Sequence, residues 1–188
     1  MKILAFAGSL RTESFNKKLA REALRVHATP LPSAAEFVDL RDYQMPIYDG
    51  DQERAQGIPD AVHALAARIG QADGLIIATP EYHGGMSSVL KNTIDWLSRV
   101  KPMPLRGKHL LLMSASPGGW GGVRGLWHSR VPFEALGVHV FPEMLSVPSC
   151  ATAFDESGHL NDPRREQLQK LVESFVACCA PAVTLRAA

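Results

Sequence analysis

The sequence has few of the features that mark secreted, membrane-spanning or nucleic-acid-binding proteins. Its 188 residues include only three cysteines, and no apolar run approaches the roughly 18 residues needed to cross a membrane. The 20 basic residues nearly balance the 19 acidic ones, and no basic run reaches five residues, so no surface is marked for nucleic acid or anionic lipid. We expect a cytoplasmic protein that binds a small molecule or another protein, with no nucleic-acid and no membrane partner.

The cysteines and the amino terminus also lack the patterns of an exported protein. Cys178 and Cys179 are neighbours in a predicted helix, where adjacent side chains diverge rather than pair. We expect both of them, and Cys150, to pack in the core. The opening MKILAFAGS has one lysine and an apolar run too short for a signal peptide, so a buried first strand explains it better.

Several motifs for phosphate or metal chemistry are absent. There is neither the Gly-Lys-Ser/Thr of a Walker A loop nor a G-x-G-x-x-G dinucleotide fingerprint. His83 is accompanied by neither an Asp-His-Ser set nor metal-spaced histidines and cysteines. The acidic segment 154–162 lacks the register of a calcium-binding loop, and we interpret it as a turn before a helix capped by Asn161 or Asp162, with Pro163 at the first helical position. We therefore expect no metal site.

The sequence does contain a regular alternation of strand and helix patterns. Short apolar runs, suited to strands buried on both faces, occupy residues 3–7, 36–40, 74–79 and 109–115, and an interrupted run occupies residues 138–145. Amphipathic helix patterns follow them, beginning at Phe15 and then spanning residues 58–69, 89–99, 124–136 and 162–179. Ser14 or Asn16 is suited to cap the first helix.

This alternation predicts an α/β fold, a doubly wound five-stranded parallel sheet with helices on both faces. No linker or shift in composition divides the chain, so we expect one domain over residues 1–188. Ligands of such folds bind at the carboxyl ends of the strands, where the strand order reverses. The loops after the first, third and fourth strands are therefore the candidate binding loops.

The first of these loops, residues 8–16, has the composition of a phosphate cradle. Gly8 allows a close backbone approach, Ser9, Ser14 and Asn16 offer short polar groups, and Arg11 offers a guanidinium. The dipole at the following helix amino terminus favours an anion. A single phosphate is the simplest guest, because the magnesium-binding machinery of a triphosphate site is absent. The alternative is a capped helix start with an incidental surface arginine.

The other two loops are rich in glycine and carry aromatic side chains. In the second, Pro80 ends the strand, Gly84 and Gly85 expose backbone groups, and Tyr82 and His83 are placed to flank an aromatic guest. The alternative is a half-buried Tyr82 and a solvated His83. The third loop has four glycines around Trp120, and we expect these glycines to let the backbone approach a planar ligand closely. Trp120 would either cover that ligand or pack under a neighbouring subunit. Together the loops suit a mononucleotide with a flat ring, and flavin mononucleotide (FMN) fits best.

The segments GSLRTESFN, PEYHGGMSSVLKNTIDW and SPGGWGG, in this order, resemble the NAD(P)H-dependent FMN reductase family, which includes chromate, quinone and azo-dye reductases. The resemblance runs from Met1 to about Leu145 and implies a flavodoxin-like fold. It implies that the FMN phosphate is held by Ser9, Arg11, Ser14, Phe15 and Asn16, that the ring edge is lined by Pro80, Glu81, Tyr82, His83 and Gly84, and that Ser116, Gly118 and Gly119 lie near the other side of the ring. The sequence departs from the commonest pattern, which has asparagine at His83 and Pro-Gly at Ser87 and Ser88.

The resemblance further implies NAD(P)H as electron donor, ping-pong transfer through FMN, and a quinone, azo dye, free flavin or metal oxyanion as acceptor. No side chain is then an obligatory catalytic acid or base, since FMN carries the chemistry. Homodimers or homotetramers are implied too, with Arg124, Trp127 and Glu143 as candidate inter-subunit residues. In the helix that follows the second loop, Lys91 and Asp95 are spaced to pair and Trp96 to pack. The alternative function is a flavodoxin-like electron carrier or a flavin-dependent interaction module.

Overall fold

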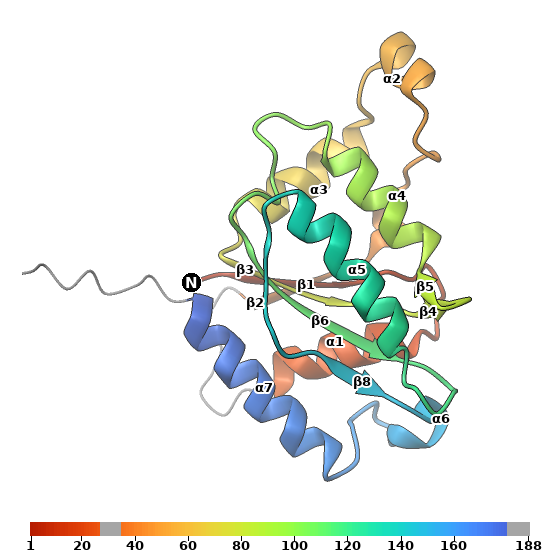
Figure 1. The fold of residues 1–188 in the computed structure, drawn as a ribbon, viewed down its shortest axis with the longest axis vertical. Coiled ribbons are helices and arrows are strands. Elements are labelled where there is room, and N and C mark those ends of the chain that lie inside the picture. The colour runs from red at the N-terminus through yellow and green to blue at the C-terminus, as the bar shows by residue number, and fades with distance from the viewer. Residues whose placement is uncertain (27–34, 180–188) are drawn as a thin grey trace, which may run out of the picture.

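The computed structural model describes residues 1–26 and 35–179, which form a parallel sheet covered by helices on both faces (Figure 1). The strands of the main sheet are β1 (Ile3–Ala7), β2 (Ala35–Val38), β3 (Gly74–Ala78), β6 (His109–Ala115), β7 (His139–Val140) and β8 (Leu145–Val147). The longer helices are α1 (Phe15–Arg25), α3 (Asp60–Gly70), α4 (Ser88–Leu97), α5 (Val123–Ala135) and α7 (Arg164–Cys179). The predicted elements are thus confirmed, with bounds shifted by a few residues.

The strand order is β2-β1-β3-β6-β7, and every pairing in this sheet is parallel. The last position is shared by two short strands, because β7 pairs with the beginning of β6 and β8 with its end. The two short strands confirm the prediction of an interrupted fifth strand near residues 138–145. The order reverses between β1 and β3, so the binding crevice of a doubly wound fold is expected above these two strands.

The strands are continuously apolar because both faces of the sheet are covered. Ile3 and Ala5 of β1 pack into one core cluster with side chains of α1 and α7, while Leu4 and Phe6 pack into the other. That second cluster contains side chains of α3, α4 and α5. Figure 1 shows the two helix layers on opposite sides of the sheet. Helices on both faces confirm the doubly wound architecture.

Four short segments were missed by the sequence patterns. One is a two-stranded hairpin of β4 (Glu81–Tyr82) and β5 (Gly85–Met86), which lies within the second candidate loop. Another is the helix α2 (Gly50–Gln56), which has no buried residue and projects from the body of the molecule in Figure 1. Short 3-10 and α segments, η1 (Leu40–Asp42) and α6 (Cys150–Ala153), complete the described structure. All four segments are too short or too polar to show a periodic pattern.

The first helix is tied to the sheet by polar contacts as well as by packing. Lys17 is almost fully buried, and its Nζ pairs with Asp39 Oδ2 at 2.8 Å, just beyond the end of β2. Glu22, also buried, accepts hydrogen bonds from His159 Nδ1 at 2.9 Å and Arg165 Nε at 3.1 Å. These contacts fix α1, and with it the first candidate loop, against β2 on one side and α7 on the other.

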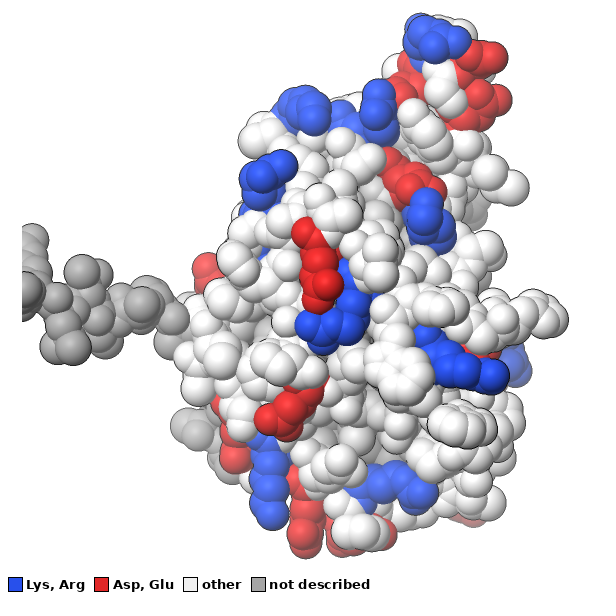
Figure 2. Space-filling view, viewed as in Figure 1, with Lys and Arg blue, Asp and Glu red and all other residues white. Residues whose placement is uncertain are grey.

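The surface carries charges of both signs without a large patch of either on the face seen in Figure 2. Lysine and arginine side chains alternate with aspartate and glutamate across this face, which agrees with the formal net charge of +1. Within residues 1–26 and 35–179, no helix combines the length and apolar character of a membrane span.

Candidate functional site

The three predicted loops meet at the carboxyl edge of the sheet and enclose a cavity of about 170 Å³. The first loop contributes Ser9, Arg11, Ser14, Phe15 and Asn16, the second contributes Pro80, Glu81 and Tyr82, and the third contributes Ser116 with its neighbours Ala115 and Pro117. Cys150, the first residue of α6, completes the lining. The remaining predicted residues, His83, Gly84, Gly118 and Gly119, lie outside this cavity.

The first loop presents an electropositive end to the cavity. Ser14 is the N-cap of α1, and its hydroxyl accepts a hydrogen bond from Lys17 N at 3.4 Å. No acidic side chain lies in the first turn of α1, so nothing there offsets the positive end of the helix dipole. Arg11 lines the cavity and forms no ion pair within the described part of the chain. An anion would therefore be stabilised at this end of the cavity.

Gly8 is required by the packing beneath this loop rather than by a ligand. A Cβ added there would lie 2.7 Å from Thr79 Oγ1, which is closer than such atoms approach. The Ser87 hydroxyl donates a hydrogen bond to Gly8 O at 2.6 Å and accepts one from Leu90 N at 3.2 Å. Ser87 thus caps α4 and joins it to the first loop, which gives a physical reason for a serine at a position where the family commonly has proline.

The Asn16 side chain joins the first and third loops. Its Nδ2 donates to Ala115 O at 3.0 Å, and its Oδ1 accepts from Ala115 N at 2.9 Å, so both ends of the amide bind the backbone at the end of β6. Asn16 is only 3% exposed. In this arrangement it positions the loops, and the helix cap falls to Ser14, which decides between the two candidates from the sequence.

The second loop is a tight hairpin, and this changes the explanation of its glycines. His83 and Gly84 form the two-residue turn between β4 and β5, with φ of 53° and 81°. Positive φ at both turn positions is typical of the type I′ hairpin, in which glycine is favoured for its conformation. Turn geometry therefore accounts for Gly84 without a ligand, and its place at the edge of the flavin ring stays a prediction. Tyr82 remains 49% exposed at the mouth of the cavity.

Glu81 braces this hairpin against α5. Arg124 Nε donates to Glu81 Oε1 at 2.8 Å, and Gly125 N donates to Oε2 at 3.1 Å. Burial by itself would raise the pKa of the Glu81 carboxyl, but the hydrogen bonds from Gly125 and Arg124 outweigh it and lower the pKa. Arg124 therefore pairs with Glu81 of the same chain. The sequence predicted Arg124 as a candidate for an inter-subunit contact and gave no sign of this partner.

The four glycines of the third loop divide into two kinds. Gly121 and Gly122 have φ of 60° and 89°, and side chains on them would collide with the backbone near Val147 and with Ser114. These two glycines are explained by contacts within the chain, contrary to the expectation that all four serve a ligand. Gly118 and Gly119 meet no close neighbour, so their backbone is the part of the loop open to a guest.

A larger, open groove of about 920 Å³ adjoins the cavity at Tyr82, which lines both. Its walls include His83 from the hairpin, Lys91 from α4, and His128 and Val131 from α5. Lys91 pairs with Asp95 at 2.7 Å, one helical turn away, as the sequence spacing predicts. No sequence signal pointed to His128, because its position in the groove depends on how α5 packs against the hairpin.

Two buried residues, Cys150 and Trp96, differ in their relation to the cavity: Cys150 lines it and Trp96 does not. Cys150 lines the cavity beside Arg11, and burial raises the pKa of its thiol. The prediction of a packing role described the burial of Cys150 but missed its place in the cavity wall. The same prediction is correct for the buried Cys179 and wrong for Cys178, which is exposed. Trp96 is fully buried, and its indole Nε1 donates to Pro46 O at 2.8 Å, which supports the segment after β2.

A cavity lined by an arginine and a helix amino terminus at the β1/β3 switch point of a parallel sheet, with an aromatic side chain at its mouth, is typical of flavodoxin-like flavoproteins. The fold agrees with this class, since an oxidised flavodoxin from Bacillus cereus superposes with a TM-score of 0.60 at 15% identity, covering 93% of this chain and 96% of that one. The chain belongs to the NADPH-dependent FMN reductase family, whose model matches residues 1–152. Family membership makes it an oxidoreductase that depends on FMN and NAD(P)H.

Relatives of known activity agree with this assignment. An NAD(P)H-dependent FMN reductase of Pseudomonas aeruginosa is 37% identical over 178 residues, 93% of each chain. A quinone reductase of Escherichia coli is 40% identical over 135 residues, covering 69% of this chain and 68% of the relative. The flavoenzyme FerB of Paracoccus denitrificans, an NAD(P)H:(acceptor) oxidoreductase, has a TM-score of 0.80 at 26% identity, with 95% of this chain and 96% of FerB covered.

Proposed function

We propose that the three loops hold FMN and that the chain transfers electrons by a ping-pong mechanism from NAD(P)H to a small oxidant, with quinones as the principal class. The observation that carries this proposal is the cavity in which Arg11, Ser9 and Ser14 converge at the amino terminus of α1. Its donors suit a phosphate, and its volume of about 170 Å³ suits the phosphate and adjoining chain of a mononucleotide whose ring extends toward Tyr82.

The residues present fit FMN, and each part of the cofactor has a place. Arg11 and the first turn of α1 would hold the phosphate, Tyr82 would flank the ring, and the open backbone at Gly118 and Gly119 would offer hydrogen-bond donors to its other side. Bound FMN supplies the hydride chemistry. The protein's own contribution is to bind, orient and surround the ring, with no side chain needed as an obligatory acid or base.

The open groove beside Tyr82 suits donor and acceptor binding in turn. It is wide, and it mixes apolar walls at Met86 and Val131 with the polar side chains of His83 and His128. A wide groove of mixed polarity does not select one oxidant, which supports an acceptor range of quinones, azo dyes, free flavin and metal oxyanions such as chromate. Quinones come first because relatives that cover most of this chain are quinone reductases.

A homodimer or homotetramer is part of the proposal. Trp120, Trp127 and Val131 are large apolar side chains that are 68%, 54% and 69% exposed, near and along α5. Covering such side chains with a second copy of the chain would stabilise the assembly, since each buried apolar Å² contributes about 25 cal/mol. A cytoplasmic location, where NAD(P)H is available, accords with this activity.

The deciding measurement is an anaerobic stopped-flow spectrum of the FMN-loaded protein mixed with NADPH or with NADH. We expect rapid loss of the oxidised flavin band with at least one nucleotide, followed by its return when a quinone is added. A flavin that stays oxidised with both nucleotides would refute the enzyme. Slow reduction together with a persistent one-electron form would favour the electron carrier, and failure to retain FMN would refute the three-loop site.

A further inference from the structure

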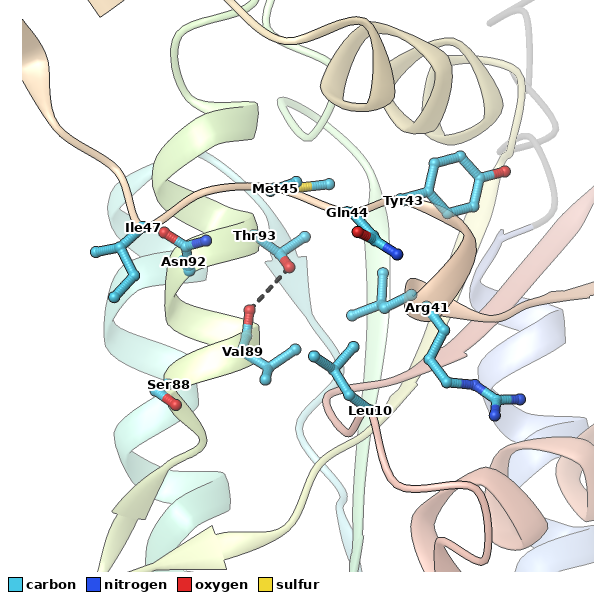
Figure 3. A pocket seen from close by; sticks show the side chains of 11 residues that line it. Leu10, Arg41, Tyr43, Gln44, Met45, Ile47, Ser88, Val89, Asn92 and Thr93 are labelled. Carbon is cyan, nitrogen blue, oxygen red and sulfur yellow. Dashed lines mark hydrogen bonds between the residues drawn. The ribbon is translucent and has the colours of Figure 1, made fainter. Parts of the chain in front are cut away.

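A second cavity lies on the other side of the first loop, and neither the phosphate cradle nor the groove uses it. Its volume is about 540 Å³, within the roughly 300–1,000 Å³ range of small-molecule sites. Leu10 of the first loop, the segment from Leu40 to Ile47 after β2, and the first turns of α4 form its walls (Figure 3). It therefore opens at the same carboxyl edge of the sheet as the proposed flavin site.

Most of the surface that the walls of this cavity expose is apolar. Leu10, Leu40, Met45, Ile47 and Val89 line it. Ile47 is 86% exposed and Leu10 is 48% exposed, so two apolar side chains stand in solvent at its edge. Covering them would release ordered water and stabilise a complex in proportion to the apolar area removed from solvent.

Two polar side chains of the walls, Thr93 and Asn92, are occupied by the protein itself. Thr93 Oγ1 donates to Val89 O at 2.8 Å, the bond drawn in Figure 3. The Asn92 amide accepts from Tyr48 N at 2.8 Å and donates to Pro46 O at 2.9 Å. Thr93 and Asn92 have little hydrogen-bonding capacity left for a guest, so an apolar group is favoured over a polar one beside them.

The one charged side chain of the lining also argues against an anionic guest. Arg41 binds Asp39 through Nε at 3.1 Å and Nη2 at 2.8 Å, and its Nη1 donates to Thr12 Oγ1 at 3.1 Å. Its guanidinium extends away from Val89 and Thr93 in Figure 3. A dinucleotide phosphate would gain little from an arginine that is already paired, and this disfavours the nicotinamide donor as the occupant.

The cavity borders the groove in which donor and acceptor would meet the flavin. Ser88 lines both of them, and Tyr82 links the groove to the phosphate cradle. Leu10 lies between Ser9 and Arg11 in sequence, and these two neighbours face the cradle while Leu10 faces the second cavity. The shared wall at Ser88 is the place where a molecule with its ring in the groove would extend an attached chain toward Val89 and Leu10.

We propose that this cavity binds the aliphatic side chain of an alkyl- or prenyl-substituted quinone acceptor while the quinone ring occupies the groove at Tyr82. The inference rests on the proposed function and deepens it by naming the class of quinone. The quinone takes up two electrons, which NAD(P)H supplies through FMN, and two protons to give the hydroquinone. The cavity takes no part in that transfer and acts only on the affinity of the acceptor.

Binding to the FMN-loaded protein, without nicotinamide, tests the proposal directly. Isothermal titration calorimetry would compare fully substituted benzoquinones, which cannot add thiols, carrying alkyl chains from methyl to decyl. Each methylene that enters the cavity should lower Kd by about fourfold until the cavity is full. A Kd that does not depend on chain length overturns the proposal.

Two variants separate the cavity from general hydrophobic binding. Val89→Phe fills it and should weaken decyl-quinone binding by about tenfold or more, while methyl-quinone binding changes by no more than about twofold. Ile47→Ser removes an exposed apolar side chain without disturbing the core, and it should reduce the dependence on chain length in the same direction. Val176→Phe, on α7, is the matched control and should behave as the wild type. Equal losses for both quinones in Val89→Phe would overturn the proposal.

Two further readouts keep the outcomes distinct. Stopped-flow reduction by NADPH and by NADH should be the same in wild type and Val89→Phe. If neither nucleotide reduces the flavin of either protein, the proposed function itself fails. Normal reduction without chain-length dependence refutes only the role of the cavity. Sedimentation velocity would show whether Val89→Phe or Ile47→Ser changes the oligomeric state. A changed state with an unchanged chain-length dependence would assign the cavity to a contact between copies and overturn the proposal.

Discussion

Arg11 and Glu81 are charged residues in neighbouring loops, and their surroundings give them different tasks. Glu81 is mostly buried and satisfied by Arg124 and Gly125, so its charge holds the hairpin to α5. Arg11 faces the cavity and forms no ion pair among the described residues, so its charge remains available for a ligand. The type of a charged residue does not show whether it holds the structure together or binds a ligand. The contacts that it makes in the folded chain show this.

Replacing Arg11 with glutamine should weaken FMN binding while leaving riboflavin binding unchanged. Loss of a charge-assisted hydrogen bond to the phosphate is worth about 1.5–3 kcal/mol, which corresponds to an increase in Kd of roughly ten- to a hundredfold. Flavin fluorescence titrations of both ligands would measure it, because riboflavin lacks the phosphate. Arg54→Gln, on the projecting helix α2, is the control. Equal weakening for both flavins would contradict a phosphate contact by Arg11.

The residue-level predictions from sequence succeeded where local chemistry is decisive. Ser14 caps α1 because a serine before an amphipathic run satisfies an otherwise unpaired backbone N–H. Lys91 pairs with Asp95 because residues four apart share a helix face. Asn16 was harder, because its partner at Ala115 is 99 positions away and no local pattern reports that contact.

At the scale of elements, backbone conformation fixes the identity of several residues in the candidate loops. The second loop is a hairpin whose turn needs positive φ at His83 and Gly84, and the third has Gly121 and Gly122 in the same region of backbone space. Glycine content indicated unusual loops correctly. It did not reveal which glycines serve the backbone, since that depends on what a Cβ would meet in the folded chain.

The third loop allows a matched pair of substitutions. Gly122→Ala should destabilise the protein by about 2 kcal/mol or more, because φ is 89° and the new methyl group would overlap the Ser114 hydroxyl. Gly119→Ala, in the same loop but with no close neighbour, should change stability by only about 0.5 kcal/mol. Urea unfolding followed by circular dichroism would compare them. Equal effects of the two substitutions would contradict the division of the glycines.

At the scale of the whole molecule, two core clusters on opposite faces of the sheet hold the helices, and a few buried ion pairs fix their positions. The pair of Lys17 and Asp39 joins α1 to the end of β2, and Asp39 also holds Arg41 at the edge of the second cavity. Burial by itself would raise the pKa of Asp39, but hydrogen bonds from Arg41 and Lys17 outweigh it and lower the pKa to about 2.

The stabilisation by Asp39 should therefore depend on pH. A carboxyl group whose pKa is lower in the folded than in the unfolded state stabilises the fold above its unfolded value of 3.8, and this contribution is lost as pH falls through about 2. Asp39→Asn leaves Lys17 buried without its counter-charge and should cost about 3 kcal/mol at neutral pH.

The difference in unfolding free energy between wild type and Asp39→Asn should narrow between about pH 4 and pH 2. Urea unfolding across this range measures it, with the exposed Asp42→Asn as the control. A difference that stays constant with pH would contradict the assigned role of the Asp39 charge.

The sequence by itself determined the strands, the main helices and the three loops that carry the site, because hydrophobic period, caps and glycine-rich breaks are local signals. It also predicted a phosphate cradle near Arg11 before any contact was known. Only the tertiary structure decided that Asn16 and Glu81 brace the loops, that Gly121 and Gly122 serve packing, and that a second, aliphatic cavity opens beside Leu10. These features depend on residues far apart in the chain meeting at one edge of the sheet, and contacts of that kind leave no periodic trace in the sequence.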